Sequence, residues 1–179
     1  MNFIYTTSYK SSVGELILGT FEDQLCLCDW KYRKMRTSIN ERIRKGLEAE
    51  FVDKETKVAK ETIGQLEAYF AGELTQFNIP LLPVGTSFQK EVWKKLTEIP
   101  YGEIRSYLQL SKDLGNTDAI RAVASANGAN AISILIPCHR IIGSDGSLVG
   151  YAGGLEAKKK LLKLEKAEIQ ADKAQLKFF

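Results

Sequence analysis

The chain has 179 residues and a formal net charge of +3, with 44% hydrophobic and 26% charged residues. This length accommodates one sizeable domain or two small ones, and the composition is that of a soluble globular protein. Because the sequence has no long uncharged apolar run and no basic-then-apolar N-terminus, we expect neither a membrane span nor a signal peptide. Three cysteines, an odd number, argue against a disulfide framework. They favour a reducing compartment, the cytoplasm or, in a eukaryote, the nucleus.

Charge is distributed unevenly along the chain. Residues 1–86 contain 11 Lys+Arg and 12 Asp+Glu, a net charge of −1, whereas residues 87–179 contain 14 and 10, a net charge of +4. A mildly basic C-terminal half permits a polyanionic partner, although many solvated surfaces have the same composition. Charge alone therefore does not decide whether the protein binds nucleic acid.

The first half of the chain predicts strands followed by a helix. Alternating apolar residues predict strands over residues 2–7, 14–20 and 24–30. The charged stretch 34–60 indicates a solvated helix and loop, and apolar residues at helical spacing predict an amphipathic helix over 62–70 that stops at Gly72. The extended, proline-punctuated segment 80–86 is the best candidate for a domain boundary.

Two cysteines, Cys26 and Cys28, lie two residues apart in the third predicted strand, so their thiols share one face. We interpret them as core residues. A zinc site is the disfavoured alternative, because the chain has a single histidine and no second cysteine pair. We therefore expect no metal.

The second half is predicted to be mainly helical. Ser87 is a candidate N-cap for a helix that ends near Pro100. Two further helices are predicted, over residues 106–114 and from Thr117 or Asp118 to about residue 127. A short glycine-containing turn joins them and the second is rich in small residues, which makes the pair a helix-turn-helix candidate. A plain helical hairpin is the alternative.

The tetrapeptide Pro137-Cys138-His139-Arg140 places a thiol beside the only histidine of the chain. The thiolate is the nucleophilic form of cysteine, and a neighbouring base makes it available near neutral pH. Any Cys-His chemistry in this protein must therefore use His139. A lone dipeptide of this kind would more often be a structural cysteine beside a hydrogen-bonded histidine, so the surrounding motifs carry the argument.

With those motifs the second half resembles the O-6-alkylguanine-DNA alkyltransferases, also called methylated-DNA–protein-cysteine methyltransferases. The resemblance covers roughly residues 86–165, whereas the first half matches only in its β-rich character. It is carried by Pro100-Tyr101-Gly102-Glu103, Ser106-Tyr107, Arg121-Ala122-Val123, Asn130, Ile136-Pro137-Cys138-His139-Arg140, Gly150-Tyr151-Ala152-Gly153-Gly154-Leu155, Lys158, Leu161-Leu162 and Glu165.

The resemblance implies a catalytic role for several of these residues. Cys138 is the implied alkyl acceptor, His139 the base that takes its proton, and Glu165 the carboxylate that orients the histidine. Because neighbours in an extended segment point to opposite faces, we expect a water molecule to bridge Cys138 and His139. Asn130 resembles the hinge residue between recognition helix and active-site segment. Tyr107 resembles the residue that donates a proton or a hydrogen bond to the guanine as it leaves, and that rotates the phosphate of the target nucleotide.

The resemblance also implies double-stranded DNA as the partner. The target carbon lies inside a duplex, so the alkylated base must be flipped out, and Arg121 resembles the residue that fills the vacated stack. The second helix of the pair is expected to enter the minor groove, which suits its small residues Ala122 and Ser125. We assign Tyr107 and Arg140 to the same DNA-binding set; Arg140 is also expected to stabilise this region through backbone or interdomain contacts.

A loop over residues 144–154 is expected to close over the flipped base. Its Tyr151, Ala152 and Gly153 are assigned to the substrate pocket together with Pro137. Some relatives carry a bulky residue where Gly153 stands, so we expect this pocket to admit alkyl groups larger than methyl. The tail 166–179 runs past the resemblance, and its Leu176, Phe178 and Phe179 either pack back on the domain or form a frayed end.

The sequence therefore predicts an α/β (α+β) protein of two domains. Residues 1–85 form a small β-sheet domain with a helix, and residues 86–179 form a mainly helical domain that contains the helix-turn-helix. We expect a cofactor-free monomer that transfers an alkyl group from O-6-alkylguanine, and from O-4-alkylthymine, to Cys138 once. The alternatives are a lesion-binding protein without chemistry, a cysteine hydrolase and a thiol-based transcriptional sensor.

Overall fold

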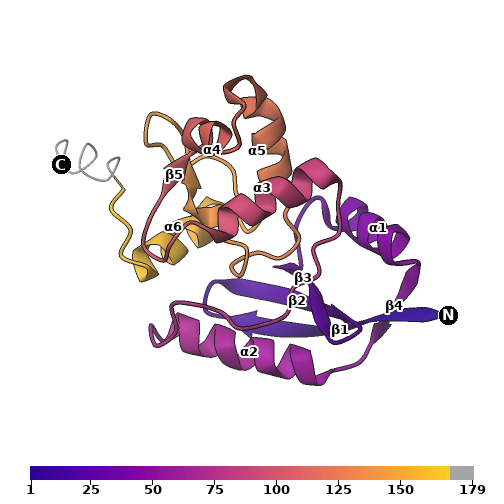
Figure 1. The fold of residues 1–179 in the computed structure, drawn as a ribbon. Helices are drawn as coiled ribbons and strands as arrows, with labels where there is room; N and C mark the ends of the chain where they lie inside the picture. The colour runs from indigo at the N-terminus through magenta and orange to yellow at the C-terminus, as the bar shows by residue number, and fades with distance from the viewer. Residues whose placement is uncertain (170–179) are drawn as a thin grey trace.

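The N-terminal half folds into a sheet whose strands follow the predicted apolar alternation. The computed structural model describes residues 1–169, and the tail residues Leu176, Phe178 and Phe179 lie outside this part. The strands are β1 (Asn2–Ser11), β2 (Gly14–Phe21), β3 (Gln24–Trp30) and β4 (Ala49–Asp53) (Figure 1). They are arranged in the order β3-β2-β1-β4, with β1 antiparallel to β2, β2 antiparallel to β3, and β1 parallel to β4.

Strand β4 was not predicted, because the charged stretch 34–60 was assigned to a helix and loop. The helical part of that prediction is α1 (Arg36–Leu47). β4 is an edge strand in which Ala49 is buried, while Glu50, Val52 and Asp53 are exposed. An edge strand with polar, solvated side chains shows little apolar alternation, so its sequence gives no clear strand signal.

Helix α2 (Lys57–Phe70) packs against the sheet and begins five residues earlier than predicted. Its true start is set by Thr56, whose side chain accepts a hydrogen bond of 3.2 Å from the backbone N–H of Ala59. The helix ends as predicted before Gly72, which has a left-handed φ of 75°. Leu66 and Tyr69 on its inner face are fully buried.

The C-terminal half is mainly helical, as expected. It contains α3 (Ser87–Thr97), β5 (Arg105–Ser106), α4 (Tyr107–Asp113), the 3-10 turn η1 (Thr117–Ala119), α5 (Ile120–Gly128), the 3-10 turn η2 (Cys138–Arg140), β6 (Ile141–Ile142) and α6 (Leu155–Leu164). The N-cap of α3 is Thr86 rather than Ser87, because Thr86 forms a capping box with Gln89. α5 begins later than predicted, since η1 takes up its expected first turn.

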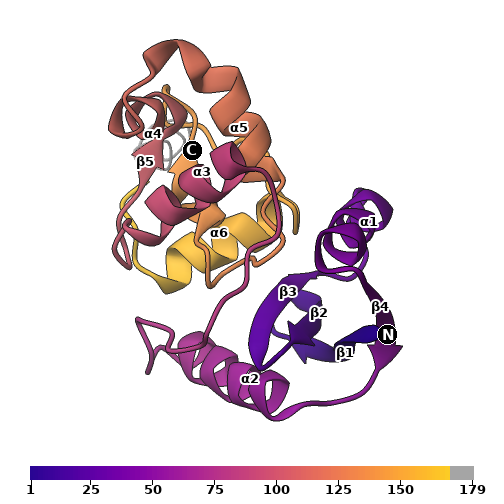
Figure 2. The same ribbon diagram turned by 45° about the vertical axis from the view of Figure 1, so that its right-hand side comes forward.

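The two halves pack against each other through a shared core. Figure 2 shows the helices of the C-terminal half beside the sheet and α1. The main cluster of buried apolar residues includes Trp30 and Tyr69 from the first half and Trp93 and Ile141 from the second. Strand β3 also pairs with the chain that follows α5. The N–H of Cys28 donates to the carbonyl of Ala131 at 2.9 Å, and the N–H of Ser133 donates to the carbonyl of Cys28 at 2.7 Å.

This packing buries Cys26 and Cys28 as the sequence predicted. Burial raises the pKa of Cys26 to about 12 and raises that of Cys28 further, so both remain unreactive thiols at neutral pH. None of the helices in residues 1–169 is both long enough and apolar enough to cross a bilayer.

Candidate active site

Cys138 begins the 3-10 turn η2, directly after Pro137. A hydrogen bond of 3.0 Å from the backbone N–H of Arg140 to the carbonyl of Pro137 closes the turn. The expectation of an extended segment here is therefore wrong, although its consequence for the side chains holds. The Cys138 thiol contacts Asn130, whereas the His139 imidazole contacts Glu165.

The Cys138 thiol is almost completely buried, with 4% of the residue exposed. The side-chain amide of Asn130 donates a hydrogen bond of 3.2 Å to its Sγ atom. Burial raises the pKa of the Cys138 thiol, and the hydrogen bond from Asn130 opposes this shift without cancelling it. The resting residue is therefore a protonated thiol, which needs a base before it can act as a nucleophile.

Asn130 connects the end of α5 to the active-site segment. Its Oδ1 accepts a hydrogen bond of 3.0 Å from the backbone N–H of Ile132, and its Nδ2 donates to the carbonyl of Ile136 at 2.9 Å. The same Nδ2 donates to Cys138, so a single buried amide holds both the turn and the thiol. This position agrees with the hinge role that the resemblance implies.

Glu165 lies at the centre of a buried hydrogen-bond network, although it follows the last residue of α6. Its Oε1 is 2.8 Å from Nε2 of His139, and the Arg140 guanidinium donates to both carboxylate oxygens at 2.9 Å. The backbone N–H of Gly102 donates to Oε2 at 3.3 Å. Burial alone would raise the pKa of Glu165, but the hydrogen bonds from His139 and Arg140 prevail and hold it well below its usual range.

His139 is fully buried, and one of its ring nitrogens has no hydrogen-bond partner within residues 1–169. Burial lowers its pKa, and Glu165 opposes that shift without cancelling it. At neutral pH the ring is therefore neutral, with the hydrogen on Nε2 directed at Glu165. Nδ1 has no hydrogen-bond partner among residues 1–169, so its lone pair can accept a proton, either directly or through one water molecule.

A pocket of about 660 Å³ opens at the thiol, between α5, the loop after β6 and the segment that joins β3 to α1. Its volume lies in the range of small-molecule sites. The predicted site residues on its wall are Tyr107, Cys138, Tyr151, Ala152 and Gly153. The lining residues Gly150 and Gly154 belong to the predicted loop 144–154. Two further walls were not predicted from the sequence: Ala124, Asn127 and Gly128 of α5, and Tyr32, Arg33, Lys34 and Met35 of the first half. In residues 1–169 no three His, Cys, Asp or Glu side chains gather as a metal site requires.

Comparison with protein families decides between the alternatives that the geometry leaves open. The family model described as "6-O-methylguanine DNA methyltransferase, ribonuclease-like domain" matches residues 4–83. The model described as "6-O-methylguanine DNA methyltransferase, DNA binding domain" matches residues 87–167. The chain belongs to the 6-O-methylguanine DNA methyltransferase family.

Individual relatives agree with this assignment along nearly the whole chain. The methylated-DNA–protein-cysteine methyltransferase of Methanosarcina acetivorans is 43% identical over 162 residues, which are 90% of this chain and 98% of that protein. The one from Mycobacterium leprae is 42% identical over 169 residues, 93% and 94% of the two chains. The crystal structure of Mycobacterium tuberculosis OGT in complex with DNA has a TM-score of 0.76 and 40% identity, and the match covers 92% of each chain.

The structure of this family member corrects the assignment of Arg140 to DNA binding. The residue is buried, with 7% exposed, and its guanidinium is occupied by the Glu165 carboxylate and by the carbonyl of Ile99 at 2.6 Å. A phosphate cannot reach a group that is already enclosed and paired. The other expectation for Arg140, stabilisation through internal contacts, agrees with these hydrogen bonds.

The pocket assignment of Pro137 and the expected effect of Gly153 on the pocket's size also need correction. Pro137 lines a separate cavity of about 210 Å³, together with Arg140, rather than the pocket that contains the thiol. Gly153 does not widen the pocket, because a Cβ atom there would collide with the indole ring of Trp30. The space that a bulky side chain would fill is occupied by this tryptophan of the N-terminal half, whose ring also packs edge-on against Tyr151.

The buried Lys158 fixes the loop that closes the pocket. Its Nζ donates to the carbonyls of Ile141, Val149 and Gly150 at 2.5, 3.0 and 3.3 Å. Burial lowers the pKa of Lys158 to about 8, and the nearby Cys138 opposes that shift. The sequence included Lys158 in the family motif without indicating this contact.

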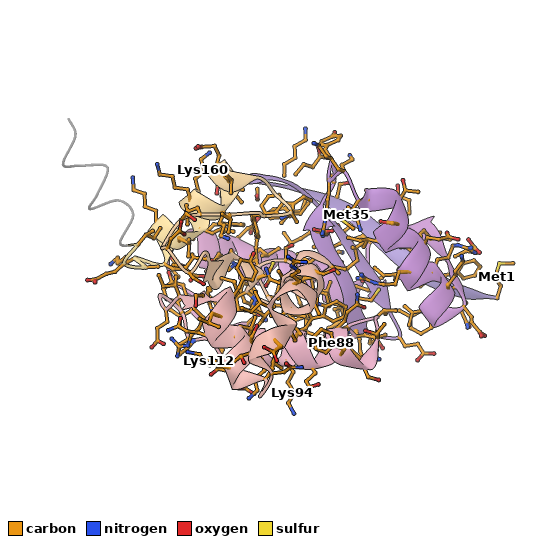
Figure 3. All side chains as sticks on the ribbon, turned by 90° about the horizontal axis from the view of Figure 1, so that it is seen from above. Met1, Met35, Phe88, Lys94, Lys112 and Lys160 are labelled. Carbon is orange, nitrogen blue, oxygen red and sulfur yellow. The ribbon has the colours of Figure 1, made fainter. Side chains whose placement is uncertain are left out.

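The predicted DNA-binding residues of α5 share one exposed face. Arg121, Ala122 and Ser125 are exposed, whereas Val123 and Ala126 point into the core. Other cations also face solvent in this half: the side chains of Lys94, Lys112 and Lys160 point away from the body of the protein (Figure 3). The small residues Ala122 and Ser125 leave the helix backbone open to close approach.

Tyr69, a residue of α2, reaches the catalytic network from the N-terminal half, and no sequence pattern predicted this role. Its hydroxyl donates a hydrogen bond of 2.6 Å to Oε1 of Glu165, the same oxygen that faces His139. Tyr69 is fully buried. Its apolar spacing on the helix predicted only a core role, and no local pattern could place its hydroxyl beside a carboxylate 96 residues later.

Replacement of Tyr69 by phenylalanine tests this contact. We expect Tyr69→Phe to slow alkyl transfer by about tenfold, because one lost hydrogen bond to a charged group is worth about 1.5 kcal/mol and loosens the carboxylate that orients His139. Single-turnover kinetics on methylated duplex DNA measure the effect. The matched control is Tyr5→Phe, on the sheet; equal rates for Tyr69→Phe and this control would show that the hydroxyl plays no part in transfer.

Proposed function

We infer that the protein reverses DNA alkylation directly, by irreversible transfer of the alkyl group from O-6-alkylguanine to Cys138. The observation that carries this inference is the position of the Cys138 thiol. The thiol lies on the wall of a base-sized pocket and accepts a hydrogen bond from Asn130. The next residue in the chain is the neutral His139, which is hydrogen-bonded to the Glu165 carboxylate. O-4-alkylthymine, which presents a comparable alkyl ether, is the second substrate that we propose.

The proposed reaction is a single in-line displacement. His139 Nδ1 takes the Cys138 proton through a bridging water molecule, and the buried Glu165 carboxylate stabilises the imidazolium that forms. The Sγ–carbon bond forms as the carbon–oxygen bond breaks, and the electron pair passes to the base oxygen. The leaving base gains a hydrogen bond from Tyr107, which lies on the pocket wall. The product is a thioether with no easy return path, so each molecule reacts once.

We propose that α4 and α5 act as a helix-turn-helix in which α5 enters the minor groove. The exposed Ala122 and Ser125 allow the helix to approach the groove closely, and Arg121 fills the gap that the flipped base leaves. The pocket is lined by Ala124, Asn127 and Gly128 of the same helix, so a base extruded beside α5 enters it directly. The protein is proposed to act as a monomer in the cytoplasm, where free thiols such as Cys26, Cys28 and Cys138 stay reduced.

Arg121→Ala separates base flipping from chemistry. We expect transfer from O-6-methylguanine in duplex DNA to fall by about 10- to 100-fold, because an unfilled stack costs a few kcal/mol. The reaction with free O-6-benzylguanine, which needs no flipping, should stay unchanged. Lys160→Ala, which removes an exposed cation of α6 (Figure 3), is the control. If both substrates slow equally in Arg121→Ala, the residue serves the pocket rather than the duplex.

The DNA product tests the proposed function itself. Duplex DNA with a single O-6-methylguanine is incubated with excess protein and digested to nucleosides, and the bases are then separated by chromatography. Restoration of unmodified guanine without any strand break or abasic site is the expected result. Tight binding with the methylated base left intact would place the protein in the lesion-binding class instead.

A further inference from the structure

The last turn of α5 receives its C-terminal cap from the other half of the protein. The final carbonyls of a helix have no partner within the helix and lie at the negative end of its dipole. Here the Arg33 guanidinium donates to the carbonyls of Gly128 and, at 2.9 Å, of Asn130. Arg42 of α1 donates to the carbonyl of Ala129 between them at 2.8 Å. Two arginines of the N-terminal half thus hold three successive carbonyls.

A buried aspartate fixes this arrangement. Asp29 is fully buried, and its Oδ2 accepts hydrogen bonds of 2.9 Å from both Arg33 and Arg36. Its other oxygen, Oδ1, accepts a hydrogen bond of 3.3 Å from the hydroxyl of Ser133, which lies three residues after Asn130. The Arg33 side chain is itself only 5% exposed. Since charges this deep are stable only in a fixed, paired geometry, the cluster behaves as a rigid connection between the halves.

The connection leads to the nucleophile through one residue. Arg33 holds the main-chain carbonyl of Asn130, and the side-chain amide of Asn130 donates to Sγ of Cys138 at 3.2 Å. We propose that Arg33, held in place by its ion pair with Asp29, is a positioning residue that keeps the side-chain amide of Asn130 hydrogen-bonded to the Cys138 sulfur. The N-terminal half thereby sets the reactivity of a thiol that belongs to the C-terminal half. This inference deepens the proposed function, since it concerns the same thiol.

A hydrogen bond to sulfur favours the thiolate, so displacement of the Asn130 amide should make Cys138 harder to ionise. The positive charge of Arg33 lowers the pKa of Cys138, and so does the Asn130 hydrogen bond that Arg33 holds in place. The experiment must therefore separate the effect of the charge from the effect of the hydrogen bond. Other charged or titratable groups that face the thiol are Asp29, Tyr107, His139, Tyr151 and Lys158. All of them are left in place by a substitution at Arg33.

Two substitutions separate geometry from charge. Arg33→Met removes both the guanidinium hydrogen bonds and the positive charge. Arg33→Lys keeps the charge, but the single ammonium group cannot reach two carbonyls and a carboxylate together. The double variant Asp29→Asn/Arg33→Met removes the buried pair as a unit, so that no unpaired carboxylate remains if Arg33→Met alone is unstable. Arg44→Met is the matched control, because in the described part of the chain Arg44 forms ion pairs with Glu41 and Glu50 alone, on the surface.

The measurement is the rate of carbamidomethylation of Cys138 in the full chain by iodoacetamide as a function of pH, read by peptide mass spectrometry. We expect the pH midpoint to rise by about one unit in Arg33→Lys, with the rate at pH 7 about tenfold lower, and no change in Arg44→Met. The rise should be larger in Arg33→Met, which also loses the positive charge, and smaller in the double variant than in Arg33→Met, because that variant also loses the charge of Asp29. A wild-type profile in Arg33→Lys would show that charge alone matters and would overturn the proposal. The reagent needs no DNA, so failure of alkyl transfer by the wild-type protein would be a separate result.

Discussion

Cys138→Ser is expected to abolish alkyl transfer and to leave DNA binding intact. An alcohol is far harder to ionise than a thiol, and a neutral imidazole such as His139 cannot generate an alkoxide here for attack on an unactivated alkyl carbon. The serine hydroxyl is small enough for the same space and can still accept the hydrogen bond from Asn130. Loss of chemistry should therefore come without loss of fold.

Transfer of a radiolabelled methyl group and fluorescence anisotropy with methylated duplex DNA measure the two properties separately. Cys26→Ser is the control, because Cys26 lies in the other half of the protein and donates to the carbonyl of Gly19 at 3.4 Å, a contact that serine can keep. Residual transfer in Cys138→Ser would assign the acceptor role to another residue. Loss of DNA binding in this variant would mean that the substitution disturbs the surface of α5.

Glu165→Gln is expected to reduce both transfer and stability. The substitution removes the charge that stabilises the His139 imidazolium and leaves the buried Arg140 without an anion. Loss of one partner of a buried ion pair typically costs about 3–5 kcal/mol of unfolding free energy. The loss of transfer rate is expected to be about 100-fold, which corresponds to about 2.7 kcal/mol of transition-state stabilisation.

The stability effect of Glu165→Gln should depend on pH. The folded-state pKa of Glu165 lies below its ordinary value of 4.5, so its contribution is fully present above that value and is lost as the pH falls below it. Urea denaturation of wild-type and variant protein at pH 7 and near pH 3.5 measures the difference. The difference in unfolding free energy between wild-type and variant protein should be smaller at the lower pH. Glu103→Gln, which removes an exposed pair with Arg105, should shift stability by less than about 0.5 kcal/mol. A constant gap at both pH values would contradict the assignment of a charged Glu165.

The sequence was most informative where chemistry and local pattern coincide. Cys138, His139 and Glu165 were selected from a motif, and the structure brings Glu165 to His139 across 26 residues. The α/β fold class, the family and the alkyl-transfer activity are confirmed. The division at residue 85, the helix-turn-helix and the individual residue roles stay predictions. Strand β3 was predicted to the residue, because its apolar residues are consecutive and buried.

The rest depends on contacts between the halves, which no local pattern contains. Tyr69, Trp30 and Arg33 all come from the N-terminal half, where their spacing indicated core or surface positions only. For the same reason the DNA-binding assignment of Arg140 and the expectation of extra room at Gly153 were wrong. Arg140 was assigned to DNA binding because it follows the Cys-His dipeptide, but its guanidinium is paired with Glu165. Gly153 indicated empty space beside it, but the indole ring of Trp30 occupies that space.

The most direct test of alkyl transfer to Cys138 is mass spectrometry of the intact protein and of its peptides after incubation with duplex DNA that carries one O-6-methylguanine. The alkyl-transfer mechanism predicts the mass gain of a single methyl group, located on Cys138, that stops at one per molecule however much DNA is supplied. Methylated DNA that is bound without any mass gain would contradict it. A methyl group on Cys26 or Cys28 would contradict it equally, because both thiols are buried away from the pocket.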